Sequence, residues 1–206
     1  MRSRILLILL IAAGVTAALW WVRDSTPPGA KPTAGTAVIA FGDSLVQGHG
    51  ASPGRDFVSL LSQRLAVPII NAGRGGDTAA SALTRLDRDV LARDPRVVIV
   101  LLGGNDVLRR VPIDRTFADL GTVVARIRER GAAVVLVGLS VGFVTDPYGR
   151  EYAALAERTA SAYVPDILDG ILHDQARMAD AIHPNDEGHR IMAERIEPAL
   201  RELLEE

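Results

Sequence analysis

The sequence predicts an α/β protein, a three-layer α/β/α sandwich in which helices cover both faces of a mainly parallel five-stranded sheet. Three observations carry this prediction. Short, continuous apolar runs alternate with segments of helical periodicity, which is typical of parallel sheets. The runs are apolar throughout, as expected of strands buried on both faces. Short strings of glycine and polar residues directly follow three of the runs, at the edge where such sheets bind ligands.

The apolar runs define the expected strands. VVIVLL at 97–102 is the clearest run and AVIAF at 37–41 is the first. Both have the length and the continuous apolar character of a buried parallel strand. The five expected strands are 37–41, 68–72, 97–102, 133–139 and, as a short strand at one edge, 165–168.

Helices are expected wherever apolar residues recur every three or four positions. In the segment 117–130, for example, Leu120, Val123, Val124 and Ile127 share one face, and Gly131 follows as a residue suited to a left-handed C-cap. The five expected helices are 56–65, 78–91, 117–130, 151–162 and 189–204.

Composition excludes several classes of function. The chain has 206 residues, of which 48% are hydrophobic and 23% charged, enough for one domain with a sizeable core. A net charge of −2 gives no basic footprint for nucleic acid, so no nucleic-acid partner is expected. Cysteine is absent from the sequence, which rules out disulfides, thiolate metal sites and a cysteine nucleophile. We expect a monomer.

The N-terminal segment predicts export. Arg2 and Arg4 precede an uncharged run over residues 5–22, which as a helix would be about 27 Å long, marginal for a membrane span. Trp20 and Trp21 suit a membrane interface and favour an uncleaved anchor over a signal peptide cleaved near Ala18. The expected organisation is a signal-anchor or signal peptide (1–24), a Pro/Gly linker (25–35) and a catalytic domain (36–206). That domain is expected in the periplasm or another extracytoplasmic space, tethered to the inner membrane by residues 5–22.

Ser44 is the candidate nucleophile. It lies in the string Phe41-Gly-Asp-Ser-Leu45, just after the first expected strand. A serine hydroxyl needs a base to remove its proton before it attacks a carbonyl group. The alternative for Ser44 is a helix N-cap, and Asp43 is expected to anchor the loop rather than to act in catalysis.

Two further strings offer donors for an oxyanion. In the string Asn71-Ala-Gly-Arg-Gly-Gly-Asp-Thr78 the part from Gly73 to Thr78 follows the second expected strand, and the spacing leaves open whether Gly73, Gly75 or Gly76 donates its N–H. The string Gly103-Gly-Asn-Asp106 follows the third, and the Asn105 amide is a second donor. The alternatives are a glycine turn that leads into a helix and an Asx turn.

The string Asp180-Ala-Ile-His-Pro184 supplies a base and its orienting group. The Asp180 carboxylate can bind one ring nitrogen of His183 and leave the other free for Ser44. A surface turn is one alternative. A metal site of Asp180, His183, Asp186 and His189 is another, although their spacing matches no metal motif. His49 and His173 have no evident partner in the sequence.

In these four strings the chain resembles the SGNH (GDSL) hydrolase family, and within it the bacterial arylesterase, thioesterase I and lysophospholipase L1 branch. The resemblance runs over residues 37–204. It implies the α/β/α fold, a catalytic triad of Ser44, Asp180 and His183, and an oxyanion hole made by the N–H groups of Ser44 and Gly76 and by the side chain of Asn105.

The expected function is hydrolysis of acyl esters or thioesters through an acyl-enzyme, without a metal or organic cofactor. The substrate is a small-molecule or lipid ester, and the membrane is a partner through the N-terminal helix. Two alternatives are a carbohydrate O-acetylesterase acting on envelope glycans and a non-catalytic envelope binding module. Four residues are candidates for an apolar acyl groove: Val107, Leu108, Val141 and Val144.

Overall fold

A five-stranded parallel sheet forms the centre of the protein. The computed structural model describes residues 29–140 and 145–205. The strand order is β2-β1-β3-β4-β5 and every pairing is parallel. The strands are β1 (Ala37–Gly42), β2 (Ile69–Gly73), β3 (Pro95–Leu101), β4 (Ala133–Val137) and β5 (Ala162–Val164).

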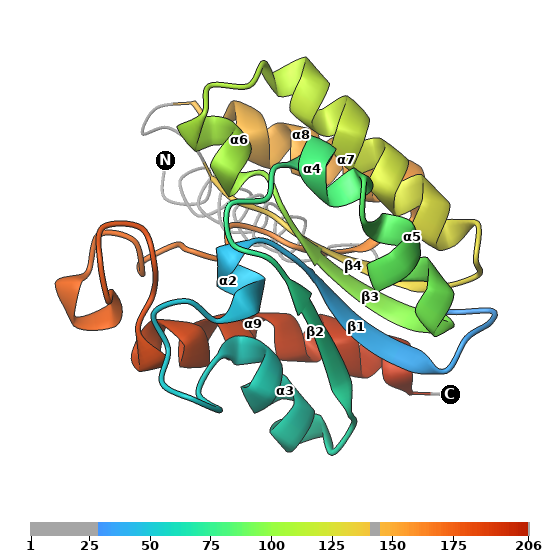
Figure 1. The fold of residues 1–206 in the computed structure, drawn as a ribbon, viewed down its shortest axis with the longest axis horizontal. Coiled ribbons are helices and arrows are strands. Elements are labelled where there is room, and N and C mark those ends of the chain that lie inside the picture. Colours follow the sequence, from blue (N-terminus) through green and yellow to red (C-terminus); the bar gives the residue numbers. More distant parts are fainter. Residues whose placement is uncertain (1–28, 141–144, 206) are drawn as a thin grey trace, which may run out of the picture.

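Helices cover both faces of this sheet, which confirms the predicted three-layer fold (Figure 1). On one face α3 (Phe57–Leu65) packs beside α9 (Asp186–Leu204). On the other face lie α4 (Ala79–Leu83), α5 (Leu86–Asp89), α7 (Ile113–Arg128) and α8 (Pro147–Thr159). Two short helices, α2 (Ser44–Gln47) and α6 (Gly104–Leu108), follow β1 and β3, and the 3₁₀ turns are η1 (Leu91–Arg93) and η2 (Gln175–Arg177). The predicted N-terminal hydrophobic helix lies outside the described residues.

The strand order places a crevice at the carboxyl ends of β1 and β3. The chain passes from β1 outward to β2 and then returns past β1 to β3. The helical connection that follows β1 and the one that follows β3 therefore lie on opposite faces of the sheet. Ligands of doubly wound proteins bind at such a switch point. In the strand register Gly42 pairs with Gly73 on one side and with Leu101 on the other, so the three strands end at one level.

One predicted helix and one predicted strand are contradicted by the structure. The helix expected over residues 78–91 is broken into α4 and α5, because the chain unwinds at Thr84 and Arg85 and the Arg85 side chain turns into the core. The prediction of an edge strand at 165–168 was wrong, since the edge strand β5 covers Ala162–Val164. Pro165 has no N–H for a ladder bond, and Asp166 has a positive φ of 26° that turns the chain away from the sheet.

Other helix ends were shifted or missed. The helices α7 and α8 begin four residues earlier than expected. Pro112 is the N-cap residue of α7, and Pro147 is the first residue of α8, a position that suits proline. The helices α2 and α6 have four and five residues, which is too short for a periodicity to be visible.

The described part of the predicted linker packs against the domain. Ala30 donates its N–H to Ala160 O at 2.8 Å, and Thr33 donates to Gly131 O at 2.8 Å. Thr36 donates to Asp94 O at 2.9 Å. The three acceptors precede β5, β4 and β3, so residues 29–36 cross the amino ends of these strands, opposite the crevice. Within residues 29–140 and 145–205, we find no helix with the length and apolar character of a membrane span.

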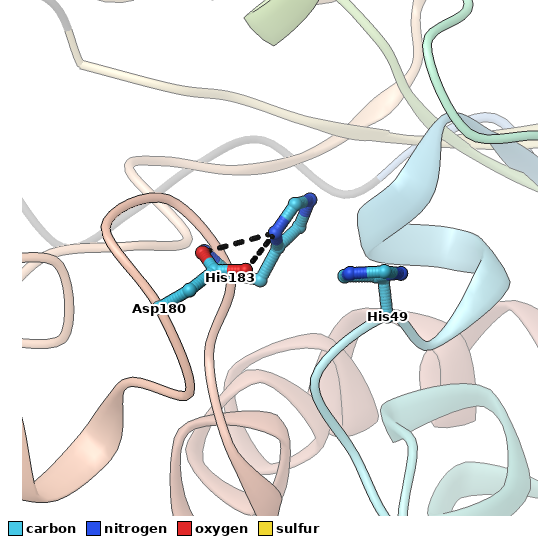
Figure 2. A group of neighbouring side chains, drawn as sticks. All are labelled: His49, Asp180 and His183. Atoms are coloured by element: carbon cyan, nitrogen blue, oxygen red, sulfur yellow. Dashed lines mark hydrogen bonds and ion pairs between the residues drawn. The ribbon is translucent and has the colours of Figure 1, made fainter.

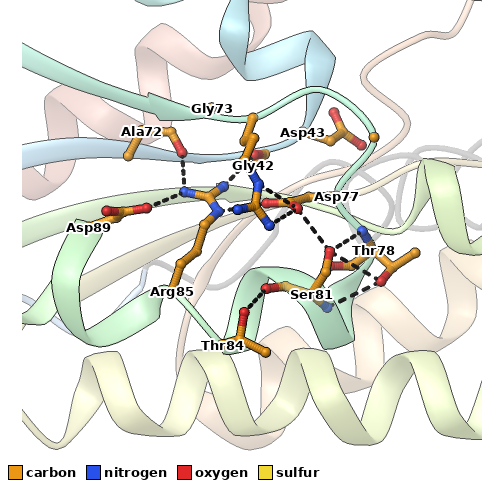
Figure 3. Close-up of polar contacts among 12 residues, drawn as sticks. Gly42, Asp43, Ala72, Gly73, Asp77, Thr78, Ser81, Thr84, Arg85 and Asp89 are labelled. Carbon is orange, nitrogen blue, oxygen red and sulfur yellow. Dashed lines mark hydrogen bonds and ion pairs between the residues drawn. The ribbon is translucent and has the colours of Figure 1, made fainter.

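A buried arginine ties the carboxyl ends of β1 and β2 together (Figure 3). The Arg85 guanidinium donates to Gly42 O and to Ala72 O, both at 2.9 Å, and its Nε donates to Asp77 Oδ2 at 2.6 Å. It also lies 4.4 Å above the centre of the Phe41 ring. Burial alone would raise the pKa of Asp77, but hydrogen bonds from Arg74, Arg85 and Ser81 outweigh it and lower that pKa. The Asp77 carboxylate is therefore charged at neutral pH.

Replacing Arg85 should destabilise the protein strongly. In Arg85→Ala the Asp77 carboxylate loses its buried counter-charge and two buried carbonyl groups lose a donor, so the free energy of unfolding should fall by about 3–5 kcal/mol. Arg88→Ala is the matched control, because the Arg88 side chain is 75% exposed and its ion pair is with the neighbouring Asp89; it should change stability by less than about 0.5 kcal/mol. Urea unfolding measures both. Equal effects of the two substitutions would contradict this account.

Candidate active site

Ser44 begins the short helix α2 at the end of β1. Asp43 is the N-cap residue of this helix and accepts the N–H of Leu45 at 3.0 Å. The N-cap role that was the alternative for Ser44 is therefore filled by Asp43. The Ser44 hydroxyl instead faces His183, with Oγ 3.1 Å from Nε2.

His183 lies on the loop before α9 and is oriented by Asp180. The distances from His183 Nδ1 to the two carboxylate oxygens are 2.8 and 3.1 Å. The carboxylate also accepts the N–H groups of Ile182 and His183, both at 2.9 Å. The bond from Ile182, followed by those from His183, lowers the pKa of Asp180 to about 2. Since a carboxylate only accepts, Nδ1 carries the proton and Nε2 presents its lone pair to Ser44.

Of the three candidate glycines, only Gly76 has an N–H without a hydrogen-bond acceptor among the described residues. Gly73 donates to Asn71 Oδ1 at 2.9 Å, and Gly75 donates to Gln47 Oε1 at 2.8 Å. Gly76 has a φ of +80°, a conformation that favours glycine. Gly76 also lines the same cavity as Ser44, so its N–H is available to a substrate there.

Asn105 lies in α6, directly after β3, and lines the same cavity. Its Nδ2 donates to Asp77 O at 3.1 Å and to Asp43 Oδ2 at 3.3 Å. The amide is therefore fixed by the two loops that carry Ser44 and Gly76. Asp43 is buried, and burial raises its pKa to about 6 although the Leu45 N–H and Asn105 act in the opposite direction.

The cavity beside these groups has a volume of about 380 Å³ and a largely apolar lining. Val107 and Leu108 line it as expected, whereas Val141 and Val144 lie outside the described residues. Sequence reasoning missed the other apolar residues at the cavity, because they come from separate loops without a common spacing: Leu45, Leu139, Leu168, Leu172 and Ile182. The three large hydrophobic residues exposed in the described chain are Leu108, Leu172 and Ile182, and all three line this cavity.

Two polar residues that support the glycine loop were also missed. Gln47 holds the Gly75 N–H, and Arg109 donates from Nη2 to Gly76 O at 2.8 Å. Both contacts join residues that are far apart in the sequence, so no local pattern could have indicated them. Together they fix the loop on either side of the Gly76 N–H.

The histidines lie differently from the sequence expectation. The ring of His49, which had no evident partner, packs on the ring of His183 with 4.2 Å between centroids (Figure 2). His189 is buried: its Nδ1 accepts the Phe57 N–H at 3.3 Å, its Nε2 donates to His49 O at 3.2 Å, and burial lowers its pKa. Asp186 accepts the Ser52 N–H at 2.6 Å. The alternative metal set that includes Asp186 and His189 is therefore not assembled in the described residues.

Comparison with known proteins identifies the family and related proteins of the same fold. A model of the GDSL-like lipase/acylhydrolase family matches residues 40–191, a span that contains all four strings. Esterase TesA of Pseudomonas aeruginosa is 32% identical over 84% of this chain and 92% of its own length. Thioesterase 1/protease 1/lysophospholipase L1 of Escherichia coli K12 is 26% identical over 84% of this chain and 88% of its own. A crystal structure of TesA, 32% identical, superposes with a TM-score of 0.77 over 82% of this chain and 100% of that one.

Proposed function

The chain belongs to the GDSL-like lipase/acylhydrolase family, and on that premise we propose that Ser44, His183 and Asp180 act as its catalytic triad. The protein is a hydrolase that acts on ester bonds, as are its named relatives. The observation that carries the proposal is the continuous chain of contacts from Asp180 through His183 to Ser44, 2.8 and 3.1 Å long. One chain supplies every group, so a monomer is sufficient.

The proposed reaction has two halves. His183 Nε2 takes the hydroxyl proton as Ser44 Oγ attacks the ester or thioester carbonyl, and the same nitrogen then protonates the leaving alcohol or thiol. Water attacks the resulting acyl-enzyme with His183 again as base, which releases the acid and restores Ser44. The steps use only protein groups and water.

The oxyanion of each tetrahedral intermediate would lie among the N–H groups of Ser44 and Gly76 and the Asn105 amide. Neither backbone N–H donates to a described residue in the resting structure. One N–H of Asn105 is held by Asp77 O, while the other makes the longer, 3.3 Å contact with Asp43. We propose that the oxyanion replaces Asp43 as the acceptor of this second N–H. The new hydrogen bond would stabilise the transition state by several kcal/mol, because it forms as the negative charge develops on the oxygen.

An acyl chain is the substrate group that the cavity fits best. Its lining is largely aliphatic, and the exposed residues Leu108, Leu172 and Ile182 gather at this one cavity. Exposed apolar side chains that cluster in this way are typical of a ligand-binding surface. A carbohydrate O-acetylesterase is the second candidate. Sugar rings stack on aromatic side chains, but among the described lining residues the only rings are the histidines His49 and His183.

We also propose that the domain works outside the cytoplasm on a membrane anchor formed by residues 5–22. The basic start, the uncharged run and the two tryptophans support this proposal. Because residues 29–36 cross the amino ends of the strands, an anchor would attach at the end of the domain opposite the cavity. That arrangement suits substrates that diffuse in the extracytoplasmic space.

Ser44→Ala and His183→Ala should each reduce kcat for p-nitrophenyl ester hydrolysis by about 10⁴-fold or more, because the nucleophile or its base is lost. Asn105→Ala should lower kcat by about 10²–10³-fold with little change in KM. Ser62→Ala is the matched control, since Ser62 lies on α3 and its hydroxyl donates to Val67 O just after that helix; it should keep the wild-type rate. Steady-state rates near wild type for Ser44→Ala would reject the triad.

Leu108→Ser should alter the preference for acyl chain length. Losing the contact of this side chain with a medium or long acyl chain should cost about 1–2 kcal/mol, or roughly 5–30-fold in kcat/KM. The acetyl ester is the internal control and should change less than about twofold. An equal loss for acetyl and lauroyl esters would exclude the acyl groove, and a wild-type rate confined to acetyl esters would favour deacetylation.

In a bacterial host the full chain should sediment with membranes and remain there after a high-salt wash. A chain that begins at Gly29 should be soluble. Protease added to cells with a permeabilised outer envelope should digest the domain if it faces outward. If expression of the full chain instead yields a shorter, soluble protein in the periplasm, the N-terminal segment is a cleaved signal peptide.

A further inference from the structure

We propose that His49, His183 and Asp180 form a binding site for a divalent transition-metal ion of the zinc type, and that the bound ion reversibly blocks the esterase. The inhibitory part of the proposal rests on the role of His183 as the base. The ion is an inhibitor and takes no part in the reaction.

Three ligand-type side chains meet at one point of the surface (Figure 2). One ring nitrogen of each histidine and one carboxylate oxygen lie within 4.8 Å of one another. Zinc binds nitrogen at about 2.0–2.1 Å and carboxylate oxygen at about 2.0–2.2 Å, so ligand atoms around it are about 3.3 Å apart. Closing the site therefore requires movements of at most about 1.5 Å.

His49 is free to make this movement. Its side chain is exposed, and in the described parts of the chain its ring makes no hydrogen bond or ion pair, only the packing contact with His183. A small rotation of the ring can therefore turn a nitrogen toward Asp180 and His183. The three residues leave a fourth position open for water, as in other three-ligand zinc sites.

The backbone holds His49 beside His183. Buried His189 donates to His49 O at 3.2 Å. The next residue, Gly50, has a φ of +92°, and a Cβ there would lie 2.3 Å from Pro184 O and 3.3 Å from His183 Cβ. The loop of His49 thus approaches the loop of His183 as closely as a glycine allows, which fixes the two rings next to each other before any ion binds.

The donor atoms select the class of ion. Two imidazole nitrogens and a carboxylate suit zinc, copper or nickel, whereas calcium and magnesium prefer oxygen ligands throughout. With 48% of the Asp180 side chain exposed, an ion can reach the site from solvent.

Coordination of the ion through either nitrogen of His183 would prevent this residue from acting as the base. If Nε2 binds the ion, its lone pair is occupied and cannot accept the Ser44 proton. If Nδ1 binds the ion, the ring proton must move to Nε2, which then carries a hydrogen toward Ser44 instead of a lone pair. In both cases the 3.1 Å contact from His183 Nε2 to Ser44 Oγ loses its function.

The first test measures ester hydrolysis by the full chain at buffered free Zn²⁺ concentrations. Wild type should lose activity and recover it with EDTA, while equal Mg²⁺ should have no effect. His49→Phe keeps a ring against His183 but has no ligand nitrogen, so its half-inhibitory Zn²⁺ concentration should rise at least tenfold. His173→Ala is the matched control, since His173 is also exposed, and it should titrate like wild type. Equal inhibition of wild type and His49→Phe would overturn the site.

The second test does not depend on catalysis. Ser44→Ala should bind one Zn²⁺ per chain in calorimetry, and one Co²⁺ with the visible absorption of a tetrahedral site. The double variant Ser44→Ala/His49→Phe should lose at least tenfold in affinity. If wild type proves inactive on esters but this binding holds, the proposed function fails and the metal site stands. If Ser44→Ala binds no ion, or binds it equally without His49, the metal site fails, and the triad is not affected by this result.

Discussion

The buried ion pair between Arg85 and Asp77 is the constraint on which the geometry of the site depends. Arg85 binds carbonyl groups at the ends of β1 and β2, and it holds the Asp77 carboxylate at the end of the glycine loop. The Asp77 carbonyl in turn accepts a hydrogen bond from Asn105, which follows β3. Three strand ends are thereby fixed relative to one another. A buried pair of this kind adds little net stability over an apolar core, so we attribute its value to the positions that it fixes.

The two halves of the proposed triad are built differently. Ser44 lies at the end of a buried strand, while Asp180 and His183 lie on a loop that is partly exposed. This loop is held by its own bonds: Ala179 donates its N–H to His183 O at 2.9 Å, and the Asp180 carboxylate accepts two N–H groups of the same turn. A base on such a loop is accessible to substrate, and for the same reason it is accessible to ions.

Much of the fold and of the candidate site was predictable from the sequence because its signals are local. The runs at β1 and β3 are continuous and apolar, and each candidate catalytic group lies in a short string next to a strand or helix end. Arg85, His49 and Arg109 were not predictable, because the contacts that define their roles join residues 8 to 140 positions apart and no spacing connects them. β5 was misplaced because three residues beside a proline give no periodicity.

The central claim is that Ser44 is a nucleophile activated by His183, and labelling with a fluorophosphonate tests it most directly. The probe reacts with activated serines, and mass spectrometry of the digested protein locates the adduct. We predict one adduct per chain, on Ser44, whose formation is at least a hundredfold slower in His183→Ala and absent in Ser44→Ala. An unlabelled wild-type chain, or a label on another residue, would contradict the account and would favour a binding module that has the fold without the chemistry.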